Sequence, residues 1–356
     1  MRTLLVAGAT GAAASRLVAR AAATPGWRVL GLCRTPRDDA PGVRYLAVDL
    51  ADADACRAAV RAAAPQGATT GMTTGVTHAV YAARAAFGEG GVEDVPANLA
   101  MLEALIAAAE GEALRHVHLV EGTKWYGMHI GPYPTPADED DTRHMPPNFY
   151  YDQQDRLAAR AASGGWAWSA SRPSFIVDVA PGRARNLAST LGAYAAICAE
   201  LGVALDFPGS EASFRSLSEV TDASLLGEAV LWMLEAPDAA GRAFNVTNGD
   251  VFRWQRFWPR LAEAFGVRCG IVRPMKLAAW MADKAPVWER LRARHGLALP
   301  LADVARWDFA DFVFGLEHDL FASTMRLRRA GFASCLDTPA HLLAQVGAYR
   351  AARILP

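Results

Sequence analysis

The sequence predicts an α/β fold in which a doubly wound parallel sheet carries a smaller, mostly helical C-terminal cap. Short apolar runs alternate with helical stretches up to about residue 180, a glycine-rich turn follows the first run, and longer helical patterns dominate afterwards. With 356 residues, the chain is long enough for one large domain and a smaller one. We expect the sheet domain to span 1–180 and about 215–250, and the cap to span about 180–215 and 250–335.

The composition argues against several classes of function. The formal net charge is −1 with both signs interspersed, which argues against a nucleic-acid or anionic-membrane partner. No apolar run approaches the roughly 20 residues of a membrane span. The five cysteines are scattered without CxxC spacing, which favours a reducing cytosol, and the eight histidines lack metal-ligand spacing. We therefore expect a cytoplasmic protein that binds no metal.

The first unit has the arrangement of a dinucleotide-binding site of the Rossmann type. Residues 3–7 form an apolar strand, and an alanine-rich helix runs to about Ala23. Between them, Gly8 allows a tight turn, Gly11 lets the backbone approach a pyrophosphate, and the helix N-terminus faces the phosphates. An ordinary strand–helix turn is the alternative. The predicted cofactor contacts in this turn are Gly8, Thr10, Gly11 and Ala12.

The end of the second strand indicates which dinucleotide binds. In a NAD-specific fold an acidic residue often follows this strand and holds the ribose hydroxyls. Here the strand at 27–33 is followed by Arg34, and an arginine at this point would pair with a 2′-phosphate. The sequence therefore predicts NADPH (NADP⁺) as cofactor, with a solvated loop arginine as the alternative.

Two further strands are expected to complete the cofactor site. The third strand, 43–50, ends in Asp49 and Leu50, near where an adenine would lie. The fourth strand, 77–83, ends in small residues, among them Ala82, that suit a position under the cofactor. Ligands of doubly wound sheets bind at the C-terminal ends of the strands, so all of these residues are candidates for cofactor contacts.

The remaining elements follow from apolar runs and helical periodicity. Between the third and fourth strands we expect a helix over 53–64 and a Gly- and Thr-rich loop over 65–77. The sheet domain continues with a helix, a strand, a helix and a strand over 92–110, 115–121, 148–162 and 166–172. Beyond it we expect helices at 186–201, 225–234 and 254–265, strands at 203–207 and 243–247, and a helical remainder rich in Trp and Phe.

Lys124 comes just after the fifth strand. The chain has only two other lysines, Lys276 and Lys284, although arginine is abundant. Lysine at this point therefore suggests a need for a compact ammonium, which a planar guanidinium replaces poorly. Because active groups of doubly wound sheets gather at the C-terminal strand ends, the sequence favours a functional lysine over an incidental one.

Two adjacent tyrosines, Tyr150 and Tyr151, open the helix expected after the fifth strand. Ordinary short-chain dehydrogenases place tyrosine and lysine as YxxxK on one helix face, so that the lysine lowers the tyrosine pKa. Here Gln154 and Asp155 stand four residues after the two tyrosines. The usual pair is therefore absent, and Lys124 on a separate segment is the lysine placed to help.

Five motifs are spread over nearly the whole chain. Residues 121–126 (EGTKWY) resemble TGxKHY, and residues 148–151 match NFYY. The other three segments are RPSFI from Arg172, LGAYAAIC from Leu191 and AFNVTNGDVFRW from Ala243, which resemble RPGxIxG, LCVYAAIC and AFNVSNGDVFxW. Together the motifs resemble those of the progesterone 5β-reductase/iridoid synthase-like (PRISE) enzymes, which are atypical extended short-chain dehydrogenases/reductases.

The resemblance implies NADPH-dependent reduction of a C=C bond conjugated to a carbonyl, with hydride added to the β-carbon of a small hydrophobic enone or enal. It implies that Tyr150 donates a hydrogen bond to the carbonyl oxygen and that Lys124 supports Tyr150. A phenol donor aimed at a developing oxyanion acts mainly in the transition state. Tyr150 is also expected among the cofactor contacts, with Pro173 and Ile176 bordering the nicotinamide. A homodimer is left open.

Two departures from the family pattern lie next to the expected site. Glu121 stands where the family has threonine, and Trp125 stands where it has histidine. Three alternatives stay open. The chain could perform carbonyl reduction or sugar-nucleotide epimerisation on the same extended fold, or it could be a cofactor-binding regulator without catalysis. In the last case Tyr150 would be a packing aromatic.

Overall fold

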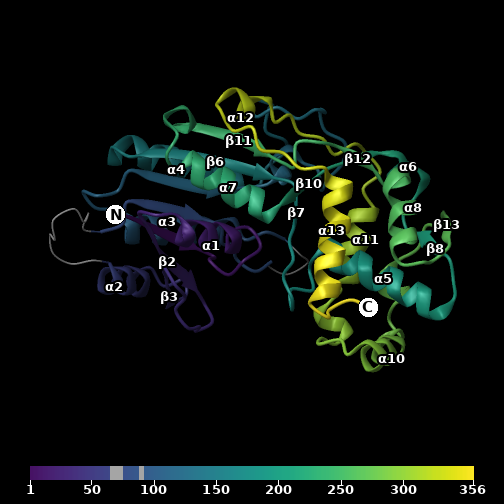
Figure 1. Ribbon diagram of the computed structural model, residues 1–356. Coiled ribbons are helices and arrows are strands. Elements are labelled where there is room, and N and C mark those ends of the chain that lie inside the picture. The colour runs from purple at the N-terminus through teal and green to yellow at the C-terminus, as the bar shows by residue number, and fades with distance from the viewer. Residues whose placement is uncertain (65–74, 88–91) are drawn as a thin grey trace.

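A seven-stranded parallel sheet organises the fold (Figure 1). The structure, a computed structural model, describes residues 1–64, 75–87 and 92–356, so residues 65–74 of the expected loop lie outside the described residues. In spatial order the strands are β11 (Arg242–Val246), β6 (Ala167–Pro173), β5 (His116–Val120), β4 (His78–Tyr81), β1 (Arg2–Ala7), β2 (Trp27–Cys33) and β3 (Val43–Ala47). The chain order reverses between β1 and β4, which makes the carboxyl ends of these two strands the expected ligand crevice. The predicted fold class is confirmed.

Helices cover both faces of the sheet (Figure 1). Leu4 and Val6 of β1 face a core shared with α1 (Ser15–Ala23) and α7 (Ala223–Met233). The alternate residue Leu5 faces a core shared with α2 (Ala53–Ala63), α3 (Val95–Ala109) and α4 (Phe149–Gly164). Both faces of the strand are therefore buried, which is why the strand is a continuous apolar run without polar alternation.

Two histidines are buried in β5. The Nδ1 and Nε2 atoms of His118 are hydrogen-bonded to the hydroxyls of Ser169 and Ser171 on β6, at 2.8 and 3.0 Å. His116 Nε2 is hydrogen-bonded to the same Ser169 hydroxyl at 2.8 Å. Burial lowers the pKa of His116 to about 4 and also lowers the pKa of His118. Both imidazoles are therefore neutral, and each is paired within the sheet.

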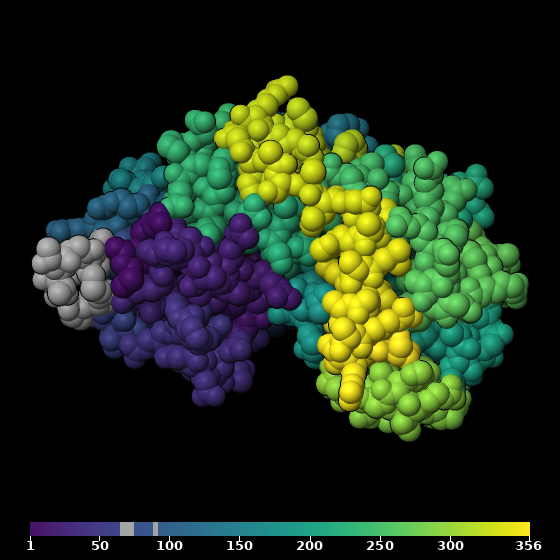
Figure 2. All heavy atoms as spheres, viewed as in Figure 1, coloured from purple at the N-terminus to yellow at the C-terminus, as the bar shows by residue number. Residues whose placement is uncertain are grey.

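The cap has an aromatic core of its own. It is formed by α5 (Leu187–Leu201), α8 (Trp254–Ala264), α10 (Ala285–His295), α11 (Trp307–Phe314) and α13 (Thr338–Ala351). Trp258 and Trp288 are fully buried there, and α13 lies beyond the range expected for the cap yet contributes to this core. The molecular surface is notched between the purple N-terminal part and the yellow helix α13 (Figure 2). The domain boundaries themselves stay a prediction.

Several short elements complete the structure. They are β7 (Phe175–Val177), β8 (Leu205–Phe207), α6 (Glu211–Arg215), β9 (Leu217–Ser218), β10 (Val220–Asp222), β12 (Phe252–Arg253), β13 (Cys269–Val272), α9 (Leu277–Trp280) and α12 (Met325–Arg329). β7 pairs with β10, β9 with β12 and β8 with β13. Among the residues described, no helix combines the length and apolar character needed to cross a bilayer.

Candidate active site

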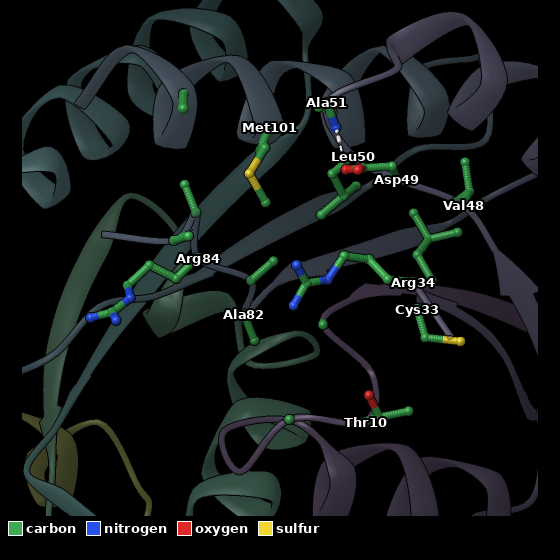
Figure 3. A pocket seen from close by; sticks show the side chains of 17 residues that line it. Thr10, Cys33, Arg34, Val48, Asp49, Leu50, Ala51, Ala82, Arg84 and Met101 are labelled. Atoms are coloured by element: carbon green, nitrogen blue, oxygen red, sulfur yellow. Dashed lines mark hydrogen bonds between the residues drawn. The ribbon is translucent and has the colours of Figure 1, made fainter. Parts of the chain in front are cut away.

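A cavity of about 410 Å³ opens at the carboxyl ends of β1, β2 and β4 (Figure 3). Seven of the residues predicted for the cofactor lie around it: Gly8, Thr10, Gly11, Arg34, Asp49, Leu50 and Ala82. Ala12 is not among the lining residues. The structure thus brings together the strand ends that the sequence assigned to the cofactor.

The glycine turn needs its glycines for steric reasons. Gly8 has a φ of +73°, and a Cβ atom there would lie 2.7 Å from the carbonyl oxygen of Ala82. A Cβ atom on Gly11 would lie 3.1 Å from the carbonyl oxygen of Gly8. The residue before α1 is Ala14, which offers no side-chain cap, so the helix N-terminus is open to an anion. These features fit the pyrophosphate of a dinucleotide.

Arg34 is exposed, and its side chain extends into the cavity (Figure 3). Among the described residues, no carboxylate or carbonyl is hydrogen-bonded to its guanidinium. Asp49, across the cavity, accepts a hydrogen bond from the backbone N–H of Ala51 at 3.0 Å. A guanidinium without a protein partner at this point is suited to an anionic ligand group.

A second cluster of predicted residues lies at the ends of β5 and β6. A Cβ atom on Gly122 would lie 3.3 Å from the hydroxyl oxygen of Tyr150 and 3.5 Å from the carbonyl oxygen of Pro173. Gly122 therefore lets the phenol approach the sheet edge. In the part of the chain that the structure describes, the Tyr150 hydroxyl has no hydrogen-bond partner. Burial, followed by the charge of Glu93, raises the pKa of Tyr150, so the phenol keeps its proton near neutral pH.

Asn148 connects the Tyr150 helix to the Lys124 turn. Its Oδ1 atom caps α4 by accepting the backbone N–H of Tyr150 at 3.1 Å. Its Nδ2 atom donates to the backbone carbonyl of Lys124 at 3.0 Å. Tyr151, by contrast, donates its hydroxyl to the carbonyl of Trp125 at 2.6 Å and packs against the indole. Asn148 had been identified only as part of a motif, and its double role needs the folded arrangement.

The ammonium of Lys124 pairs with a carboxylate that the sequence analysis missed. Lys124 Nζ lies 2.7 Å from Oε1 of Glu93, which itself lies 3.9 Å from Nη1 of Arg84, a residue lining the cofactor cavity. Within the described residues, no hydrogen bond joins Lys124 to the Tyr150 hydroxyl. The expected support of Tyr150 by Lys124 is thus not a direct contact in this structure. Glu93 pairs with Lys124, and its charge also acts on Tyr150.

The two residues that depart from the family motif, Glu121 and Trp125, both contact Arg172. Arg172 Nε lies 2.8 Å from Oε2 of Glu121, and both side chains are almost fully buried. The guanidinium carbon of Arg172 lies 3.6 Å from the centre of the Trp125 ring. Burial raises the pKa of Glu121 to about 7 despite the opposing charge of Arg172. Glu121 and Trp125 are therefore coupled, since both contact the same buried cation.

Ile176 lies on β7, where it pairs with Thr221 of β10, and it packs against the core beneath α1 and α7. Pro173 and Ile176 thus sit at successive points along the chain that leaves β6. Their contact with a nicotinamide stays a prediction.

Comparisons with known proteins agree with the sequence motifs. Residues 67–356 match the family described as PRISE-like Rossmann-fold domain. The chain belongs to this family. The resemblance found in the motifs is confirmed by relatives along the chain. The (S)-8-oxocitronellyl enol synthase ISY1 of Nepeta cataria is 33% identical, over 99% of this chain and 92% of that protein. The short chain dehydrogenase gsfE of Penicillium aethiopicum is 34% identical, over 69% of this chain and 71% of that protein.

Solved structures share the fold of this PRISE-family chain at lower identity. A short-chain dehydrogenase/reductase superfamily protein from Agrobacterium tumefaciens, with bound NAD, matches with a TM-score of 0.67 and 17% identity, over 99% of this chain and 98% of that one. The UDP-glucose 4-epimerase of Thermus thermophilus, in complex with NAD, matches with a TM-score of 0.65 and 18% identity, over 98% of this chain and 99% of that one. These likenesses support the doubly wound architecture and nothing finer.

Proposed function

We propose that the protein is an NADPH-dependent ene-reductase that adds hydride to the activated C=C bond of small hydrophobic enones or enals. The coarser class, an oxidoreductase of the PRISE type that uses a nicotinamide cofactor, is supported by family membership. The finer activity is supported by the site. An enol, the product class in the name of the Nepeta relative, is the protonated form of the enolate that such a hydride addition creates.

The observation that carries the proposal is the free, protonated phenol of Tyr150 at the carboxyl edge of the sheet. The Tyr150 hydroxyl and the Pro173 carbonyl both lie next to the open face of Gly122. When bound, the cofactor would supply a hydride from nicotinamide C4. Tyr150 would donate its O–H to the substrate carbonyl as negative charge develops there, which lowers the barrier mainly in the transition state.

The remaining residues would bind the cofactor, orient Tyr150 and hold the Lys124 ammonium in place. The glycine turn and the N-terminus of α1 would hold the pyrophosphate, and Arg34 would hold the 2′-phosphate that distinguishes NADPH from NADH. Asn148 fixes Tyr150 relative to the Lys124 turn. Glu93 holds the Lys124 ammonium at 2.7 Å, which fixes the position of that positive charge on the turn after β5.

The proposal is tested by NADPH oxidation with an enone panel followed by product analysis. We expect turnover of 2-cyclohexen-1-one and of a linear enal, with the carbonyl retained in the product. Cyclohexanone is the matched control that lacks the C=C bond, and we expect it to be inert. Reduction of cyclohexanone to the alcohol at a similar rate would support the carbonyl reductase alternative. Binding of NADPH without turnover of any enone would support the regulator.

A further inference from the structure

A second cavity lies in the cap, away from the proposed active site. It has a volume of about 670 Å³ and is bounded by the C-terminal half of α5, by β8 and β13, and by the segment from α9 to Lys284. Figure 1 shows β8 and β13 on the opposite side of the molecule from β2 and β3. The N-cap of α5, Asn186, bonds to the carbonyl of Asp178, whose carboxylate pairs with Arg16 of α1 beside the cofactor turn. A 15-residue helix spans about 22 Å, so most of the length of α5 separates the two places.

The walls of this cavity are apolar and partly open to solvent. Of the ten large hydrophobic side chains exposed among the described residues, four line this one cavity: Leu201, Val203, Ile271 and Trp280. Its floor contains the buried side chains of Ile197 and Met281. Single exposed apolar residues are ordinary, whereas a cluster around one cavity marks a place where an apolar group binds.

The mouth of the cavity is positively charged. Its lining includes three cations, Arg268, Arg273 and Lys284, against one carboxylate, Asp206, for a net charge of +2 in a chain whose net charge is −1. The two oxygens of Asp206 are already used, because Oδ1 accepts the Ile271 N–H at 2.9 Å and Oδ2 lies 2.6 Å from Arg273 Nε.

The other two cations differ in their internal compensation. Lys284 contacts the adjacent Asp283, which is 81% exposed. Arg268 is exposed and, among the described residues, has no ion-pair partner. Arg268 is therefore the cation of the mouth that is left for an incoming anion.

We propose that this cavity is a binding site for an amphipathic carboxylate, with the alkyl chain between Ile197, Ile271 and Trp280 and the carboxylate at Arg268. The site is independent of the reaction proposed above. An isologous contact centred on this mouth would place the same positive charge against itself, so charge favours the anion over such self-association.

Binding at this site is non-covalent. Cys198 lies on the floor of the cavity, and burial raises the pKa of its thiol to about 12. The thiol is therefore protonated at neutral pH and does not act as a nucleophile.

The test is calorimetric titration of the full-length protein with decanoate at low and high salt. We expect decanoate to bind wild type, to bind more weakly as salt screens the mouth, and to bind at least about tenfold more tightly than decyltrimethylammonium, which has the same tail and the opposite charge. Arg268→Glu should weaken decanoate by about tenfold at low salt. The matched control is Arg260→Glu, which makes the same charge change at an exposed α8 position outside the cavity and should leave affinity unchanged.

A second variant and a sedimentation measurement complete the test. Ile271→Ser should weaken decanoate several-fold without changing NADPH binding or the thermal midpoint, which shows that the fold is intact. Equal binding of the two decyl compounds, affinity insensitive to Arg268→Glu, or no binding at 1 mM decanoate would each overturn the proposal. Sedimentation of a dimer that Ile271→Ser dissociates would also overturn it, because the occupant would then be a second copy.

Discussion

The two halves of the candidate active site are built differently. The cofactor cavity is formed by one turn, Gly8 to Gly11, and by the ends of neighbouring parallel strands. The Tyr150 centre is assembled from separate segments that carry Glu93, Lys124, Tyr150 and Pro173. Local sequence therefore specifies the first half almost completely, whereas the second exists only after the sheet has brought distant residues together. Substitutions in the two halves should accordingly affect different quantities.

The largest effect is expected at Tyr150. Tyr150→Phe removes the donor to the developing oxyanion but keeps the ring, so the turnover rate should fall roughly 10²- to 10⁴-fold. The dissociation constant for NADPH, measured by fluorescence titration, should change little. Tyr151→Phe is a matched control, because the Tyr151 hydroxyl is bonded to the Trp125 carbonyl. A rate unchanged by Tyr150→Phe would remove the phenol from the chemistry.

Substitution of Arg34 should change the affinity for NADPH, which the Tyr150 substitution leaves almost unchanged. Arg34→Ala should raise the dissociation constant for NADPH roughly 10- to 100-fold, because a charged hydrogen bond is lost, while the constant for NADH changes little. Arg37→Ala is the control, since Arg37 packs over the Tyr45 ring 4.5 Å away and does not line the cavity. If wild type binds both cofactors equally, the assignment of Arg34 to the 2′-phosphate is wrong.

Substitution of Glu93 tests whether the residues of the Tyr150 centre act together. Glu93→Gln should lower the turnover rate roughly tenfold by releasing the Lys124 ammonium from its fixed position. Burial, followed by the Glu93 charge, raises the pKa of Tyr150, so Glu93→Gln should lower the pKa of the phenol and still leave it protonated near neutral pH.

A double-mutant cycle completes this test. If Glu93 acts through Lys124, then Glu93→Gln should have little further effect on rate in a Lys124→Met background. Additive losses would instead indicate a structural role for Glu93.

The smallest effect concerns stability. The backbone carbonyl of Glu219 accepts the Ser174 hydroxyl, and its Oε2 atom accepts the Ala322 N–H at 3.0 Å. Burial raises the pKa of the Glu219 carboxyl from 4.5 to about 8. Between pH 4.5 and about 8 the folded chain therefore binds more protons than the unfolded chain, so the free energy of unfolding falls as pH rises. Glu219→Gln keeps an acceptor for the Ala322 N–H. In chemical denaturation, the fall in the free energy of unfolding between pH 6.5 and 7.5 should be about 1 kcal/mol smaller for this variant than for wild type.

Glu263→Gln, at an exposed position of α8, is the control and should leave the pH dependence unchanged. Identical pH dependence in wild type and Glu219→Gln would show that Glu219 is ionised in the folded chain.

The sequence allowed the sheet to be predicted because its buried parallel strands are continuous apolar runs separated by helices. It did not allow β7 and β10 to be predicted, since each is a three-residue strand paired with the other across more than 40 residues of chain. β13 was also missed, because its residues are half exposed and give no periodic signal.

The same reasoning explains the site. Gly8, Gly11 and Arg34 occupy fixed places relative to strand ends, so their positions follow from the pattern. Tyr150 and Lys124 needed the family resemblance. Glu93 gave no signal, because a carboxylate before a helix is common and its partner lies 31 residues away. A charge partner of this kind is determined by tertiary packing rather than by local sequence.

The central claim is that hydride goes to the β-carbon of an enone whose carbonyl oxygen is held by Tyr150. The most direct measurement is transfer from NADPH deuterated at the reactive C4 position to 2-cyclohexen-1-one, with the product examined by NMR. We predict deuterium at the β-carbon of cyclohexanone, with the carbonyl retained. Deuterium on the carbinol carbon of 2-cyclohexen-1-ol would contradict the account.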